Sequence, residues 1–311
     1  LYGDEHRIAP ILERERGLRE ACEIRHSNEV IGHEDKPSQA LRRGRGSSMR
    51  LAIDAVAGGD AGGVVSAGNT GALMAMAKFV LKTVPGIDRP AIASFFPTMR
   101  GESTMLDLGA NVDCDANNLV QFAVMGAAFA RTSLGIQRPT VGLLNVGVED
   151  VKGNEAVRNA GQILKEVRLP FEFAGFVEGD DIGAGTVDVI VTDGFTGNVA
   201  LKTAEGTSRL YTSFLAAAFR RSVVSRLGYF LAKPALEALR QKVDPRVYNG
   251  ALFVGLNGVV VKSHGGTDAT GFASAIGVAI DMVSGRYSDL IVADCEQFSA
   301  AVEPVQRAAA L

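Results

Sequence analysis

Short apolar segments that run into glycine-rich loops and then into helical patterns recur along this chain, and this alternation constrains its fold more than any other feature. The apolar segments predicted to form strands lie at 103–109, 139–146 and 187–192. The helical patterns after these strands, and after the glycine-rich segment 61–68, lie at 119–131, 155–167, beyond 198, and at 72–82. Such repeats are typical of an α/β protein with a largely parallel sheet. Strands that are apolar on both faces indicate helices on both sides, so we predict three α/β/α layers.

The loops between these elements hold many of the 36 glycines in the 311 residues. Glycine lets the backbone approach a ligand closely, and the free N–H groups at a helix start suit an anion. Ligands of parallel sheets bind beyond the carboxyl ends of the strands. We therefore expect four or five loops to meet at one sheet edge and bind an anion, although tight turns alone would explain any single loop. The Asn257-Gly258 pair further predicts a hairpin between two short strands, followed by a helix over 269–282.

Composition and motifs exclude several classes of protein. The formal net charge of −3 argues against generic coating of nucleic acid. Apolar runs stay well short of the roughly 18 residues that cross a bilayer. Three distant cysteines predict neither a disulfide framework nor a zinc site, so we expect a soluble protein of a reducing compartment. Neither a Walker sequence nor a complete Gly-x-Gly-x-x-Gly motif occurs, and we expect no cofactor and no metal.

Four polar residues in or beside these loops are candidates for chemistry. Lys152 follows a predicted strand in a glycine-bounded loop, although most lysines are solvated surface charges. His264, flanked by Lys262, Ser263 and two glycines, is the strongest candidate for proton transfer near neutral pH. The amides of Asn69 and Asn198 suit a carbonyl or a phosphate, or else they cap helices. Cys114 lies between two aspartates, which disfavour a thiolate, so we interpret it as a structural thiol.

The segment 205–246 is more basic than the rest of the chain. It carries eight lysines or arginines against three acidic residues, with apolar residues at helical spacing. We expect the run Leu227-Gly-Tyr-Phe-Leu-Ala, just before Lys233-Pro234, to form an apolar tip. A helical hairpin that packs on the body or on a second subunit would explain this pattern. A docking surface for an acidic partner or an anionic membrane would explain it as well.

Seven motifs occur in order over about residues 36–280. They are Lys36-Pro-Ser-Gln-Ala with Arg45-Gly-Ser-Ser-Met, Val65-Ser-Ala-Gly-Asn-Thr-Gly-Ala, Leu106-Asp-Leu-Gly-Ala-Asn-Val-Asp-Cys, Leu144-Asn-Val-Gly with Val151-Lys-Gly, Thr192-Asp-Gly-Phe-Thr-Gly-Asn-Val with Leu201-Lys-Thr, Tyr248-Asn-Gly-Ala, and Val261-Lys-Ser-His-Gly. Together they resemble the bacterial phosphate acyltransferases of phospholipid synthesis, the acyl-acyl carrier protein:phosphate acyltransferases. That family opens with a strand and a Met-Gly-Gly-Asp turn, whereas this chain opens at Leu1-Tyr-Gly-Asp. We therefore expect the first strand to be missing from one catalytic α/β domain over 1–311, into which the helical arm 205–246 is inserted.

The resemblance implies a fold like that of phosphotransacetylases and the isocitrate dehydrogenase class. It implies transfer of a long-chain acyl group from acyl-[acyl carrier protein] to inorganic phosphate, by direct attack of phosphate on the thioester. The acyl phosphate would then supply phosphatidic acid synthesis. It also implies a homodimer in the cytoplasm, at the inner face of the cell membrane, with an anionic membrane surface and a downstream membrane glycerol-phosphate acyltransferase as further partners and no nucleic acid.

Residue roles follow from the same resemblance. Lys152 would neutralise phosphate or oxyanion charge, Asn198 would bind the thioester carbonyl, and His264 would serve the leaving thiolate. The residues expected to bind phosphate and substrate are Ser66, Gly68, Asn69, Thr70, Gly71, Asn111, Asp193 and Lys262. Those expected to contact the carrier protein or the membrane are Arg220, Arg221, Arg226, Leu227, Tyr229, Phe230, Leu231 and Lys233.

Three other functions would explain parts of the sequence. A phosphotransacetylase acting on acyl-coenzyme A would share the phosphate site and would need no basic dock. A metal- and nicotinamide-dependent dehydrogenase would share the fold and would display a carboxylate cluster. A non-catalytic carrier-protein or membrane adaptor would explain the arm alone.

Overall fold

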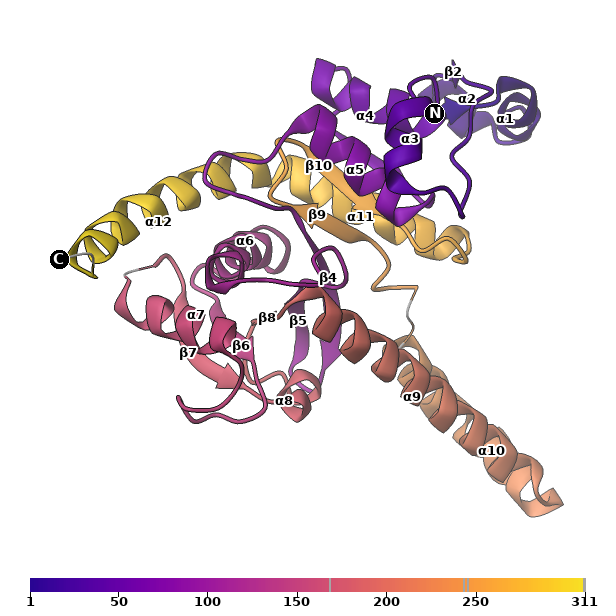
Figure 1. Ribbon diagram of the computed structural model, residues 1–311. Coiled ribbons are helices and arrows are strands. Elements are labelled where there is room, and N and C mark those ends of the chain that lie inside the picture. Colours follow the sequence, from indigo (N-terminus) through magenta and orange to yellow (C-terminus); the bar gives the residue numbers. More distant parts are fainter. Residues whose placement is uncertain (168, 243, 245, 310–311) are drawn as a thin grey trace.

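One eight-stranded sheet runs through the protein in the computed structural model, which describes residues 1–167, 169–242, 244 and 246–309 (Figure 1). Its strands, in spatial order, are β3 (Gly63–Ser66), β10 (Val259–Lys262), β9 (Ala251–Val254), β4 (Ala91–Thr98), β5 (Gly101–Leu106), β8 (Val189–Val191), β6 (Thr140–Leu144) and β7 (Glu172–Val177). Four of the seven neighbouring pairs are parallel, namely β3–β10, β5–β8, β8–β6 and β6–β7. The mostly parallel sheet confirms the predicted fold class.

The strands run in two directions. The pairs β10–β9, β9–β4 and β4–β5 are antiparallel, so β3, β4 and β10 point one way and the other five strands point the opposite way. The loops after β3 and β10 therefore leave one edge of the sheet, and those after β5, β6 and β8 leave the other. The expectation that the glycine loops meet at a single edge is wrong, because the antiparallel pairs in the centre reverse the strand direction.

Helices cover both faces of the sheet, as predicted. One apolar cluster joins the sheet to α6 (Ala116–Leu134), α7 (Glu155–Glu166), α11 (Ala269–Ser284) and α12 (Tyr287–Ala309). The cluster on the other face joins it to α3 (Pro37–Arg43), α4 (Ser48–Gly58), α5 (Thr70–Leu81), α8 (Gly179–Ala184) and the start of α9 (Gly194–Arg220). At the N-terminus, β1 (Tyr2–Gly3) and β2 (Arg25–His26) form a small parallel pair beside α1 (Glu5–Leu12) and α2 (Arg16–Ala21).

The basic segment forms a helical hairpin that projects from the body (Figure 1). Its helices are α9 and α10 (Val223–Lys242), and the rings of Phe219 and Tyr229 meet edge to face at 5.3 Å between them. We call residues 205–242 the arm. None of the described helices has an apolar stretch long enough to cross a membrane.

The position of the arm's tip differs from the sequence-based expectation. The chain turns at Arg221 and Ser222, so the apolar run 227–231 lies along the first half of α10, and Pro234 lies inside that helix. Val223 and Val224, which are 80% and 79% exposed, stand at the turn instead. A helix tolerates an internal proline when other contacts compensate, which makes proline an imperfect marker of helix ends.

Candidate active site

A pocket of about 440 Å³ lies at the carboxyl ends of the parallel strands β3 and β10. Its lining comes from four separate parts of the chain: a loop near residue 33, the start of α5, α9, and the loop after β10. The lining residues are His33, Ala67, Gly68, Asn69, Thr70, Gly71, Lys202, Lys262, His264 and Gly265. Six of them, namely Gly68, Asn69, Thr70, Gly71, Lys262 and His264, are residues that the sequence analysis singled out.

The loop after β3 forms one wall of this pocket. The Ser66 hydroxyl accepts a hydrogen bond from the Gly68 N–H at 3.2 Å, which tightens the turn into α5. Asn69 caps α5, because its Oδ1 accepts from the Ala72 N–H at 3.0 Å. A helix start concentrates backbone N–H groups and positive dipole charge, so this wall suits an anion.

The Asn69 side chain also holds a second segment of the chain over the pocket. Its Nδ2 donates to the carbonyls of Gly32, His33 and Asp35 at 3.2, 2.9 and 3.0 Å. Both N–H bonds of the amide are thus directed at protein carbonyls. A phosphate in the pocket would meet the backbone of this turn rather than the Asn69 side chain.

The hydrogen bonds from Asn69 bring His33 to the wall of the pocket. A methyl group on Gly265 would lie 3.7 Å from the His33 ring, so the two loops approach each other closely. The sequence analysis passed over His33 because the surrounding segment lacks the glycine-loop pattern. Only the fold reveals that residues 32–35 lie against the start of α5.

Lys262, at the end of β10, supplies a half-buried cation. It is paired in register with Ser66, and its Nζ donates to the Ala67 carbonyl at 3.5 Å and to the Ser263 carbonyl. Burial lowers the pKa of Lys262, because the charged ammonium loses solvation. An anion in the pocket would offset that loss.

His264 is fixed by its backbone and by one ring nitrogen. Its N–H donates to Oδ1 of the buried Asn249 at 2.8 Å, and Nδ1 accepts from the Gly266 N–H at 3.1 Å. The Asn249 amide in turn donates to the Ser263 hydroxyl at 2.8 Å and to the Gly271 carbonyl at 2.6 Å. Because Nδ1 is occupied as an acceptor, Nε2 remains as the N–H donor of the neutral ring.

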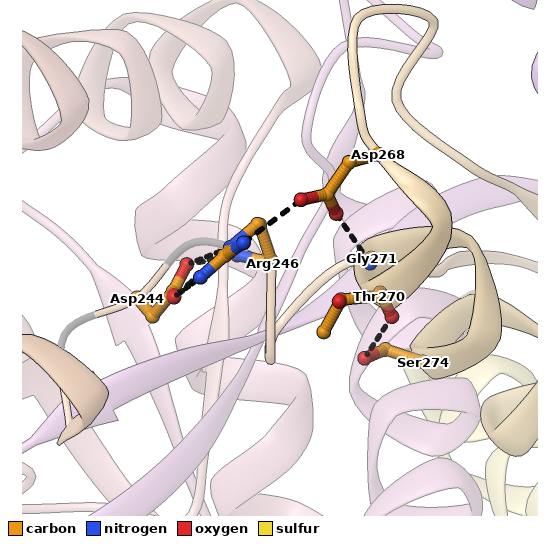
Figure 2. Close-up of polar contacts among 6 residues, drawn as sticks. All are labelled: Asp244, Arg246, Asp268, Thr270, Gly271 and Ser274. Carbon is orange, nitrogen blue, oxygen red and sulfur yellow. Dashed lines mark hydrogen bonds and ion pairs between the residues drawn. The ribbon is translucent and has the colours of Figure 1, made fainter.

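An arginine clamp fastens the segment just after the arm to the loop that carries His264 (Figure 2). The Arg246 guanidinium binds both carboxylate oxygens of Asp244 at 2.6–3.0 Å and reaches Asp268 at 2.8 Å. Asp268 also caps α11 by accepting from the Gly271 N–H at 3.1 Å. Arg246 lowers the pKa of both carboxyl groups by hydrogen bonding to their charged forms. The end of α10 is thereby tied to the pocket loop.

Just before the arm, Lys202 on α9 also lines the pocket. Its Nζ lies 3.0 and 3.1 Å from the carboxylate oxygens of Glu205, one helical turn further on. The sequence analysis gave Lys202 no role, although the Leu201-Lys-Thr motif contained it. Its place in the pocket depends on α9 running from the far edge of the sheet back towards β3 and β10.

Four other predicted residues belong to the loops at the opposite edge of the sheet. Asn111 braces its own loop, with Nδ2 donating to Pro90 O at 2.8 Å and to the buried Asp107 carboxylate at 2.9 Å. Asp193 caps α9 by accepting from the Thr196 N–H at 2.8 Å. Asn198 is exposed on α9 against Gly109, and Lys152 is exposed in the loop after β6. None of these four lines the pocket among the residues that the structure describes.

The residues predicted to contact a carrier protein or the membrane all lie in the arm. Leu227, Phe230 and Leu231 are 61%, 72% and 74% exposed, and Tyr229 is 46% exposed. The basic members are likewise exposed, and they are Arg220, Arg221, Arg226 and Lys233. The arm therefore presents these apolar and basic side chains outside the pocket.

Cys114 has the environment of an unreactive thiol. Burial, with a further contribution from the charge of Asp107, raises the pKa of the thiol to about 11. A thiol with such a pKa stays protonated near neutrality and is a poor nucleophile. This environment agrees with the interpretation of Cys114 as structural.

Comparison with known proteins places the chain among acyl-transferring enzymes. Residues 1–289 match a family described as fatty acid synthesis protein. A phosphate acyltransferase of Rhodospirillum centenum is 63% identical over 301 residues, which cover 97% of this chain and 85% of the relative. A phosphate acyltransferase of Paramagnetospirillum magneticum is 57% identical over 310 residues, covering 99% of this chain and 88% of the relative. A solved phosphotransacetylase from Streptococcus pyogenes shares the fold, with a TM-score of 0.55 and 19% identity over 85% of this chain and 78% of its own.

Proposed function

We propose an acyl donor and a mechanism for this chain, which belongs to the phosphate acyltransferase family. It is an acyltransferase with phosphate as the acceptor. The donor that we propose is a long-chain acyl-[acyl carrier protein], and the product is an acyl phosphate used in phospholipid synthesis. The observation that carries the proposal is the pocket, whose lining combines Lys202, Lys262, two histidines and the start of α5, with no carboxylate among the described lining residues.

The pocket chemistry supports direct attack by phosphate. Backbone N–H groups of residues 68–71 and the Lys262 ammonium would bind and orient the anion. A phosphate oxygen then forms a bond to the thioester carbonyl carbon, and the carbon–sulfur bond breaks. The departing thiolate takes a proton from the Lys262 ammonium, and the Nε2–H of the neutral His264 ring donates a hydrogen bond to the sulfur, so no covalent enzyme intermediate is needed. Hydrogen-bond donors aimed at the developing oxyanion supply much of the rate in such reactions.

The residues at the far edge remain candidates for the donor side of the reaction. Asn198 lies one helical turn before Lys202 on α9, within reach of a carbonyl bound beside the pocket. Lys152 is exposed in the loop after β6, and its proposed role is to neutralise the oxyanion charge. The Asn111 carbonyl supports the start of α9 by accepting from the Gly194 N–H at 2.7 Å, and Asp193 caps the helix by accepting from the Thr196 N–H at 2.8 Å.

The arm is the proposed docking surface for partners. The basic side chains of Arg220, Arg221, Arg226 and Lys233 complement an acidic carrier protein or anionic lipid headgroups, and the exposed apolar side chains of 227–231 suit a membrane surface or a second subunit. We accordingly propose a homodimer joined through the arm, at the inner face of the cell membrane in the cytoplasm. In this proposal one catalytic α/β domain carries the arm as an insertion.

Release of free thiol from palmitoyl-[acyl carrier protein], with and without inorganic phosphate, tests the proposed function. We expect phosphate-dependent release and a much lower rate with acetyl-coenzyme A. His264→Ala should lower turnover about 100-fold without unfolding the protein, as expected for loss of a hydrogen-bond donor to developing negative charge. The parallel Lys152→Ala variant decides whether the far edge takes part in the chemistry. Release that does not depend on phosphate would refute the proposal.

A further inference from the structure

One face of α9 leads from the pocket to a row of exposed apolar side chains. Phe195, Asn198, Val199 and Lys202 are spaced by three or four residues, so they share a face over about 10 Å of helix. Lys202 lines the pocket, whereas Phe195 and Val199 are 62% and 51% exposed. Along this face Lys202 is followed by Val199 and Asn198, which lie side by side, and then by Phe195.

The apolar end of this face continues on the neighbouring loop. The Gly194 N–H donates to the Asn111 carbonyl at 2.7 Å, which places the following residues, Phe195 and Val112, on adjoining segments. Val112 is 61% exposed. Exposed apolar side chains in one area mark a surface that binds an apolar ligand or partner.

The order of these side chains matches the order of groups in the reacting complex. An anionic phosphate, a thioester carbonyl and a hydrocarbon chain follow one another in the same sequence as Lys202, Asn198 and Phe195, and Val199 lies beside Asn198 on the same face. Resting on the proposed function, we propose that this face of α9 is the acyl track of the enzyme. Lys202 is a phosphate-binding catalytic residue, and Phe195 and Val199 determine the preference for a long acyl chain.

The ion pair of Lys202 with Glu205 is consistent with this role. The Lys202 side chain is 53% exposed, so its attraction to Glu205 is weakened by solvent, and a dianionic phosphate replaces that partner readily. Arg209 also faces Glu205, at 3.9 Å and with 74% of its side chain exposed, but it does not line the pocket. It therefore provides a matched control for loss of a cation beside Glu205.

The first test compares the phosphate dependence of Lys202→Met and Arg209→Met. We expect the KM for phosphate to rise about tenfold or more in Lys202→Met, because a charged hydrogen-bond donor is lost, while Arg209→Met stays near wild type. Equal phosphate KM values in Lys202→Met and wild type would overturn the assignment of Lys202.

The second test compares acyl chains of two lengths. In the double variant Phe195→Ser, Val199→Ser, the ratio of kcat/KM for palmitoyl- over butyryl-[acyl carrier protein] should fall about tenfold, because the longer chain loses apolar contact. Ile280→Ser is the control, since Ile280 is 57% exposed on α11, outside both the arm and the pocket. Val199→Thr keeps the side-chain shape and should show a smaller fall.

These outcomes separate the inference from the proposed function. A wild-type chain that releases thiol in a phosphate-dependent way, with an unchanged chain-length ratio in the double variant, overturns the acyl track alone. A wild-type chain with no phosphate-dependent release removes the proposed function and the acyl track together.

Discussion

The pocket and the arm differ in how far their side chains are buried and hydrogen-bonded within the protein. At the pocket, the buried Asn249 amide makes three hydrogen bonds, and the Asn69 side chain binds one N–H and three carbonyls. In α10, all of whose residues are described, no side chain is buried, and the ion pair Lys233–Glu237 spans 3.7 Å in solvent. The fold itself therefore sets the pocket geometry, whereas the arm keeps apolar surface that only a partner can cover.

The strongest test of this difference removes the central amide of the pocket. Asn249→Ala should lower the free energy of unfolding by about 2–4 kcal/mol, since a buried hydroxyl, N–H and carbonyl lose a partner. Turnover should fall on the order of 100-fold, because His264 loses its fixed position. Chemical denaturation and thiol release would measure the two effects.

Asn249→Asp separates position from stability in the same experiment. The carboxylate still accepts from the His264 N–H but cannot donate to Ser263 or Gly271. Near-normal turnover and stability in Asn249→Ala would show that the pocket loop is held by the Arg246 clamp alone.

A change in the arm should leave the fold intact and affect only the acyl donor. Reversing the charge of Arg220, Arg221 and Arg226 to Glu should raise the KM for acyl-[acyl carrier protein] about tenfold, and the effect should weaken with added salt. Thermal unfolding should change little, because these side chains are exposed.

The matched control reverses three arginines in the N-terminal segment. Arg7, Arg14 and Arg19 are exposed, so their change to Glu alters the net charge equally but away from the arm. Equal KM values for the two triple variants would assign the effect to overall charge and leave the arm with a structural role.

The smallest expected effect is a change in pH dependence at the pocket. Burial lowers the pKa of Lys262, so its positive charge is lost at a lower pH than for an exposed lysine. Phosphate affinity should then decrease as the pH rises from neutrality towards the ordinary lysine pKa of about 10.4. Lys262→Arg should move this decrease to higher pH, because the guanidinium stays charged.

The free energy of unfolding should change with pH in the direction opposite to phosphate affinity, and it tests the same lowered pKa of Lys262. Since the folded state disfavours protonated Lys262, raising the pH through its lowered pKa relieves a cost of folding. Stability should therefore rise slightly with pH over the interval where phosphate affinity declines, and Lys262→Met should abolish that rise. A phosphate KM that is flat with pH in the wild type would contradict the assigned cation.

The helices and strands of the fold could be predicted from local sequence patterns. The predicted hairpin at Asn257-Gly258 is confirmed by the antiparallel strands β9 and β10, and the predicted helices at 72–82, 119–131 and 155–167 match α5, α6 and α7. Local signals were also sufficient for the helical arm. They misplaced its tip, because the apolar run 227–231 lies along α10 and the chain turns at Arg221 and Ser222.

Only part of the pocket lining could be predicted from the sequence. Gly68, Asn69, Lys262 and His264 lie beside sequence signals that identify them, namely glycines at the end of an apolar strand. Lys202 and His33 have no such signal. Lys202 lies on α9, which begins at the opposite edge of the sheet, and His33 lies in an N-terminal loop without a glycine-rich pattern. Asn69 shows a further difference, because the side chain expected to face phosphate is engaged by residues 32–35.

The sequence by itself determined the α/β class, the elements, the family, and the glycine loop and basic residues from which a phosphate site is built. Strand direction, and with it the edge at which each loop emerges, was decided only by the tertiary structure. Hydrophobic periodicity records which residues are buried but is the same for a strand and its reverse. The three successive antiparallel pairs β10–β9, β9–β4 and β4–β5 set those directions, and together they separate the loops of β3 and β10 from those of β5, β6 and β8.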